Sequence, residues 1–173
     1  MARPPLVPSA PVVPVVRAEF LRARNFEYVR AARALVDANG TVCAQGRSVV
    51  LTASKTLDVS ESGSTFYLNL AGGFTLTLPA PGLGLAFNFI VKTAPTTAYI
   101  VANHLGSSGD NIIGHVLSSS GGAEDAETTA GGDQVNFVAN TAVGGDRLTL
   151  ESDGTYWYAS ARCAAAGGIT ITG

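Results

Sequence analysis

Apolar and polar positions alternate along most of the chain from residue 47 onward, and this period of two is typical of strands buried on one face. The segment Phe74–Leu78 is the clearest case, since its apolar residues alternate with two threonines. Glycine- and proline-rich turns separate these segments, which is the pattern of a β-sandwich or barrel. The sequence therefore predicts a mainly β body, an antiparallel β-sandwich or β-barrel of the jelly-roll or tulip-like kind. The predicted strands are Ser48–Ala53, Thr65–Leu70, Phe74–Leu78, Leu85–Lys92, Ala98–Asn103, Asn111–Leu117, Gln134–Ala139, Arg147–Glu151, Thr155–Arg162 and Ile169–Thr172.

Two local signals refine this body. Asp153-Gly154 lies between two β-rich runs and predicts a hairpin turn. The cluster that follows places Trp157 on one face of its strand and both neighbouring tyrosines on the other, and we expect the tryptophan to face the core. Residues 118–132 are mostly serine, glycine, alanine and acidic residues, so we expect a long exposed loop there.

The first 46 residues differ from the body. Residues 1–16 carry repeated prolines and valines, which predicts an extended arm lying on a partner. Residues 17–46 form a basic segment, in which 17–38 has helical periodicity and Asn39-Gly40 supplies a stop. A hairpin turning at Asn39-Gly40 is the alternative. The predicted organisation is an arm over 1–16, a basic segment over 17–46 with a possible short helix, and a β domain over 47–173.

Charge is distributed unevenly between these parts. Residues 1–47 hold seven arginines against three acids, for a net charge of 7 − 3 = +4, and residues 48–173 hold four cations against ten acids, for 4 − 10 = −6. The acidic body disfavours approach to nucleic acid, so protein carboxylates are the expected partners of the arginines. The expected contact residues are Pro4, Pro5, Val12, Val13, Val15, Arg17, Arg22, Arg30 and Arg33.

Candidate chemistry is sparse. The chain has two histidines and no nucleophile-elbow, zinc or calcium-loop motif, so we expect no catalytic site, no metal and no cofactor. His115 lies in a predicted strand and is expected to be structural, while Cys43 and Cys163 are expected to be free core residues. Acidic residues in the loops could line a groove for polysaccharide hydrolysis, although no stacking aromatics accompany them. No apolar run is long enough to span a membrane, and the proline-rich start lacks the apolar core of a secretion signal.

The order of several phrases in residues 48–173 resembles small decoration (cement) proteins of tailed-phage capsids. The phrases are Phe74-Thr-Leu-Thr-Leu-Pro-Ala-Pro81, Leu85-Ala-Phe-Asn-Phe-Ile-Val-Lys-Thr93, Asp110-Asn-Ile-Ile-Gly114, Gln134-Val-Asn-Phe-Val-Ala-Asn140, Gly145-Asp-Arg-Leu-Thr-Leu150 and Ser152-Asp-Gly-Thr-Tyr-Trp-Tyr158. Each phrase alone is an ordinary β-turn-β unit, and only the ordered set carries the resemblance. It implies a homotrimer on the outer surface of the virion that binds the major capsid protein and bridges neighbouring capsomers.

Two other functions stay open at this point. A fibre or receptor-binding module would recognise a host-surface glycan or protein, and it predicts a solvent-exposed Trp157 or Tyr99. An enzyme acting on polysaccharide would need a deep pocket that holds two carboxylates.

Overall fold

A computed structural model describes residues 47–106, 109–120, 124–125 and 131–173 of the chain. The predicted arm, the choice between helix and hairpin over 17–38, and Cys43 all lie outside these residues. Within the described part, the strands are β1 Ser48–Leu51, β2 Lys55–Thr56, β3 Thr65–Leu68, β4 Phe74–Thr77, β5 Ala86–Val91, β6 Tyr99–Ala102, β7 Ile112–Ser118, β8 Glu124–Asp125, β9 Gln134–Phe137, β10 Arg147–Ser152, β11 Trp157–Cys163 and β12 Ile169–Thr172. One 3-10 turn, η1, covers Val59–Glu61.

All ten predicted strands are confirmed, with bounds that shift by at most a few residues. The pattern missed β2 and β8, because each has only two residues and no apolar alternation. The predicted loop over 118–132 is corrected in part. It contains β8, and its last two glycines, Gly131 and Gly132, are buried where a bridge pairs Ile112 with Gly132.

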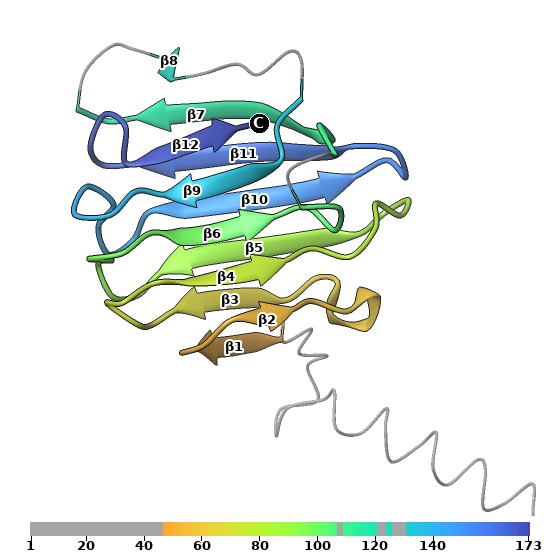
Figure 1. The fold of residues 1–173 in the computed structure, drawn as a ribbon, viewed down its shortest axis with the longest axis horizontal. Coiled ribbons are helices and arrows are strands. Elements are labelled where there is room, and N and C mark those ends of the chain that lie inside the picture. The colour runs from red at the N-terminus through yellow and green to blue at the C-terminus, as the bar shows by residue number, and fades with distance from the viewer. Residues whose placement is uncertain (1–46, 107–108, 121–123, 126–130) are drawn as a thin grey trace, which may run out of the picture. The chain divides into compact units, whose positions relative to one another are not determined.

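The strands form two sheets that pack face to face as a β-sandwich. The seven-stranded sheet has the order β1-β3-β5-β10-β11-β7-β8, and the five-stranded sheet has the order β12-β9-β6-β4-β2. Figure 1 shows the strands of both sheets running roughly side by side across the molecule, with β1 and β2 at one side and β7 and β8 at the other. The mainly β sandwich predicted from the sequence is therefore confirmed.

The sandwich is mixed and not wholly antiparallel as predicted, because five of the ten strand pairings among the described residues are parallel. From β1 to β6 the chain crosses from one sheet to the other after every strand. Two such crossings return it to the first sheet in its original direction, so β1, β3 and β5 pair in parallel, as do β2, β4 and β6. This half of the domain is a flattened coil of three turns. Alternation within a strand is the same for parallel and antiparallel partners, so the pattern could not distinguish them.

The second half closes the sandwich with antiparallel pairings, except that β7 and β11 pair in parallel. β10 and β11 form the hairpin predicted at Asp153-Gly154, and they lie between β5 and β7. β9 pairs with β6 on one side and β12 on the other in the five-stranded sheet. The seven-stranded sheet is thus continuous only because this hairpin fills the gap between β5 and β7.

The core lies between the sheets and is rich in aromatic rings. Phe66 stacks on Phe89 with ring centroids 5.6 Å apart, and Phe87 lies 5.6 Å from Trp157. Trp157 is fully buried, as its alternation with two tyrosines predicted. Tyr99 is also fully buried, and its hydroxyl donates to the Thr93 carbonyl and accepts from the Leu70 amide. The body is therefore a well-packed scaffold whose core is built around these buried aromatic rings.

Candidate functional site

The residues predicted to bind a partner lie outside the described part of the chain. These are Pro4, Pro5, Val12, Val13, Val15, Arg17, Arg22, Arg30 and Arg33. Their role stays a prediction.

Glu61 is a buried carboxylate that holds the β2–β3 connection. Its side chain accepts hydrogen bonds from the Lys55 ammonium and from the Asp58 backbone amide, while Asp58 accepts from the Ser60 amide. This reciprocal arrangement is the capping box of η1. The Lys55 hydrogen bond holds the pKa of Glu61 below its ordinary value, with Asp58 and the nearby Arg47 contributing less. Glu61 therefore serves the fold.

Two further buried carboxylates fasten connections in the same way. Asp133 accepts hydrogen bonds at Oδ1 from the amides of Gly109 and Asp110 and from the Asn103 side chain, and the two amides lower its pKa. Asp146 accepts from the Val143 amide at one oxygen and from the Ala164 amide at the other. Asp133 thus joins the connection that contains Asn103, Gly109 and Asp110 to the start of β9. Asp146 joins the connection before β10 to the segment after β11.

Acid should destabilise the β domain through Glu61 and Asp133. Their pKa values are lowered in the folded state, so their stabilisation is fully present above the unfolded-state values near about 4 and is lost as pH falls through the folded values. We expect the melting temperature to fall steeply below about pH 4. In Glu61→Gln it should already be lower at pH 7 and should fall less on acidification. Calorimetry at several pH values measures both effects.

The matched control is Glu151→Gln, which changes an exposed carboxylate on β10. Its melting curves should follow those of the parent at every pH. An equal acid response in the parent and in Glu61→Gln would contradict the assignment of Glu61.

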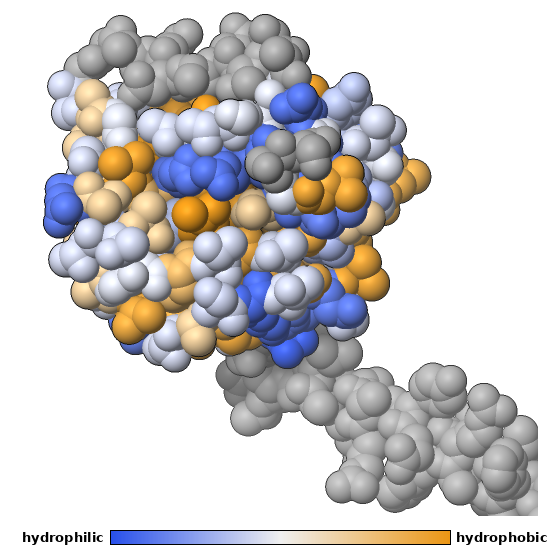
Figure 2. Space-filling model, viewed as in Figure 1, coloured by the Kyte–Doolittle hydropathy of each residue, from blue (hydrophilic) through white to orange (hydrophobic). Residues whose placement is uncertain are grey.

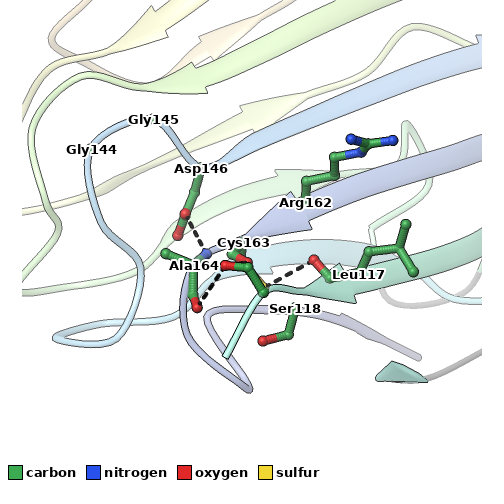
Figure 3. A pocket seen from close by; sticks show the side chains of 9 residues that line it. Leu117, Ser118, Gly144, Gly145, Asp146, Arg162, Cys163 and Ala164 are labelled. Atoms are coloured by element: carbon green, nitrogen blue, oxygen red, sulfur yellow. Dashed lines mark hydrogen bonds between the residues drawn. The ribbon is translucent and has the colours of Figure 1, made fainter. Parts of the chain in front are cut away.

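A surface pocket of about 500 Å³ lies beside the ends of β7 and β11. It is lined by Leu117, Ser118, Ser119, Gly144, Gly145, Asp146, Arg162, Cys163 and Ala164. Figure 3 shows the Asp146 carboxylate turned to the Ala164 amide, while the Arg162 side chain points away from it. Asp146 is the single carboxylate among the lining residues, whereas glycoside hydrolysis needs two. The pocket does not match the expectation for a polysaccharide-cleaving site.

The remaining chemistry-bearing residues are dispersed. His115 is exposed on β7, and Cys163 is buried with a free thiol that contacts the Leu117 carbonyl, as expected for a small core residue. Among the described residues no group of three or more His, Cys, Asp or Glu side chains is placed to hold a metal ion.

The most distinctive surface feature is a set of three adjoining connections at one end of the sandwich, which we name the loop end. It comprises the β2–β3, β4–β5 and β10–β11 connections, over residues 57–64, 78–85 and 153–156. The backbones are joined directly, since Gly63 donates to the Ala86 carbonyl and Gly84 to the Ser152 carbonyl. These hydrogen bonds make the three loops one surface.

Large apolar side chains stand out from the loop end. Leu83 is 85% exposed, Val59 is 55% exposed and Tyr156 is 39% exposed. Tyr158, at the adjoining start of β11, is 47% exposed. Figure 2 shows orange apolar residues interspersed with polar ones over the visible face and also along the edge where these loops lie. Exposed apolar residues on loops that hydrogen bonds hold in place are typical of contact surfaces.

Two ionised carboxylates border this apolar group. Asp153 accepts from the amides of Tyr156 and Thr155 and from the Tyr158 hydroxyl, and these bonds lower its pKa, the Tyr156 amide most. The hydrogen bond from the Tyr158 hydroxyl to Asp153 raises the pKa of Tyr158. Asp58 has a lowered pKa because Ser60 donates to it. The loop end is thus an apolar contact surface with an acidic border.

The sequence around Leu83 indicates that this side chain is exposed, although the alternation of apolar and polar residues does not. Leu83 stands between Gly82 and Gly84, in a turn whose other residues are mostly small. A large apolar residue there has no strand to place it in the core, so it faces solvent. Val59 shows no such signal, because Val is common in strands and the turn η1 was not expected.

No family model matches the chain. A stretch of 30 residues is 77% identical to the peptidoglycan transport system permease protein YejE of Agrobacterium fabrum. This stretch covers 17% of the present chain and 8% of that protein, so the similarity is confined to a short segment. Within the described part of the chain no helix is long and apolar enough to cross a membrane. The comparisons therefore assign the chain to no family.

Proposed function

We propose that the chain is a structural virion protein that binds the outer surface of a tailed-phage capsid as a homotrimer. It stabilises the shell by bridging neighbouring subunits of the major capsid protein. The ordered phrases of the β domain that resemble decoration proteins support this proposal, as does the sandwich they form. The buried carboxylates also support a structural role, because their hydrogen bonds hold connections of the fold.

The observation that carries the proposal is the position of the chain's entry into the β domain. Arg47 accepts a hydrogen bond from the Thr65 amide at its carbonyl, and its guanidinium lies 3.8 Å from Glu61 of the loop end. The preceding segment therefore joins the domain at the end that also displays Leu83 and Val59. An arm attached there and the loop end can contact one partner surface together, and three linked subunits multiply that contact by avidity.

In a co-sedimentation test, the full chain should bind purified tailed-phage capsids that lack their own decoration protein. Deletion of residues 1–16 should abolish binding while the β domain stays folded, because the arm supplies pre-stiffened contact at low entropic cost.

The variant Leu83→Ser/Tyr156→Ser should weaken binding by about tenfold through loss of apolar contact. Native mass spectrometry of the free chain should give a trimer.

The matched control is Leu70→Ser, which changes an exposed apolar residue at the opposite end of the sandwich. It should bind like the parent. Saturation of capsids by the chain that lacks residues 1–16 would contradict the arm, and failure of the full chain to sediment with every capsid tested would contradict the function.

The alternative is a fibre or receptor-binding module, and the exposed pair Tyr156 and Tyr158 favours it. This alternative also predicts a solvent-exposed Trp157 or Tyr99, but both side chains are fully buried. Binding of the free chain to host cells, lost in Tyr156→Ser/Tyr158→Ser, would support this alternative over the capsid.

A further inference from the structure

We propose that a pair of arginines on the outer face of the seven-stranded sheet binds the carboxylates of an acidic protein segment. The pair consists of Arg147 on β10 and Arg162 on β11. It lies at the far end of the β10–β11 hairpin from Asp153, so it is separate from the loop end. The inference does not depend on the proposed capsid role.

The register of the hairpin places these two cations face to face. Arg147 is directly opposite Arg162 in the antiparallel pairing, and both side chains are exposed. Residues in direct register have Cβ atoms about 4.5–5.5 Å apart, and like charges at that distance destabilise a sheet. The fold therefore maintains a like-charge contact that one substitution would relieve.

No ion pair within residues 47–106, 109–120 and 131–173 involves Arg147 or Arg162. The ion pairs found there both involve Glu61, with Arg47 and Lys55. Residues 48–173 hold four cations against ten acids, and two of those four cations are this pair. A local positive site on an otherwise acidic body fits an anion supplied from outside.

Apolar residues flank the pair along the same row of the sheet. Ile90 is opposite Arg147 and Leu117 is opposite Arg162. Tyr67 and Val50 continue the row beyond Ile90, and Glu124 of β8 is the position beyond Leu117. Leu117 is 40% exposed and Val50 is 51% exposed. This row suits an extended polypeptide whose carboxylates meet the guanidinium groups while its aliphatic parts cover the flanks. A long polyanion such as nucleic acid suits it less, because the rest of the body repels it.

The test is a titration of the ¹⁵N-labelled full chain with the peptide acetyl-Thr-Glu-Thr-Glu-Thr-amide, followed by nuclear magnetic resonance of the arginine Nε–Hε groups. The signals of Arg147 and Arg162 should shift and saturate. The double variant Arg147→Gln/Arg162→Gln should bind at least about fivefold more weakly, a loss expected for two charge-assisted contacts at an exposed site. The control Arg3→Gln/Arg24→Gln removes the same charge elsewhere, at arginines outside the expected contact residues, and should keep the parent affinity at this site.

A second variant separates binding from folding. Arg147→Glu places opposite charges in register, so its melting temperature should rise by about 1–3 °C while the peptide shifts disappear. A lower melting temperature would overturn the proposal, because the pair would then serve the fold. Unchanged affinity in the double glutamine variant would also overturn it. So would equal shifts with the glutamine form of the peptide or inorganic phosphate, or tighter binding of oligothymidylate.

Discussion

Trp157→Ala is expected to lower the free energy of unfolding by about 3–5 kcal/mol, a large part of the stability of a domain of this size. The indole is fully buried, and its ring lies 5.6 Å from that of Phe87 at the centre of the core. Truncation would leave a cavity between the sheets that rigid strands cannot close. Urea denaturation followed by circular dichroism measures the change in midpoint.

Trp157→Phe is the matched control. The indole Nε1 is buried without a hydrogen-bond partner, so phenylalanine removes no hydrogen bond and leaves only a smaller gap. Its loss should be about 1–2 kcal/mol. An alanine variant with the parent midpoint would contradict the placement of Trp157 in the core.

Gly114→Ala should also be strongly destabilising, lowering the free energy of unfolding by about 3 kcal/mol. A Cβ at this position would lie 2.0 Å from the Ala159 carbonyl oxygen and 2.7 Å from its Cβ. Gly114 and Ala159 are paired in the parallel contact between β7 and β11, so both backbones must separate. That pairing joins β7 to the rest of the seven-stranded sheet.

Gly72→Ala is the comparison for this position. An added Cβ there meets nothing within 4 Å, and the expected change is within about 0.5 kcal/mol. Equal midpoints for Gly114→Ala and the parent would contradict the close approach of β7 and β11.

The strands could be predicted from the sequence because their periodicity is a local property. Phe74–Leu78 shows this, since Phe74, Leu76 and Leu78 are buried and the intervening threonines are partly exposed. The hairpin at Asp153-Gly154 was equally local, because Asp153 accepts hydrogen bonds from the amides that follow it. Partners in the sheets were not predictable, since the pairing of Thr65 with Asn88 joins residues of different turns of the coil.

The candidate binding residues also differ in whether local sequence could identify them. The arginines of the basic segment over 17–46 were identified by composition, which indicates what a segment can bind but not where it lies. Arg147 and Arg162 are fifteen positions apart in the sequence, and only the register of the hairpin brings them together. A surface that several loops or strands form together depends on the order and pairing of the strands. The alternation of apolar and polar residues within one strand does not reveal that order.

Because the β10–β11 hairpin lies between β5 and β7, the seven-stranded sheet cannot be completed before this hairpin has been synthesised. A ribosome makes β7 before either strand that links it to β5, so β7 must wait with one edge unpaired until Cys163 has emerged. The coil from β1 to β6 needs no later strand for its internal pairings and can assemble as each turn appears. A nascent chain halted near Arg147 would expose two open strand edges, the form most prone to aggregate. The β10–β11 hairpin thus decides whether a translated β domain becomes a complete sandwich.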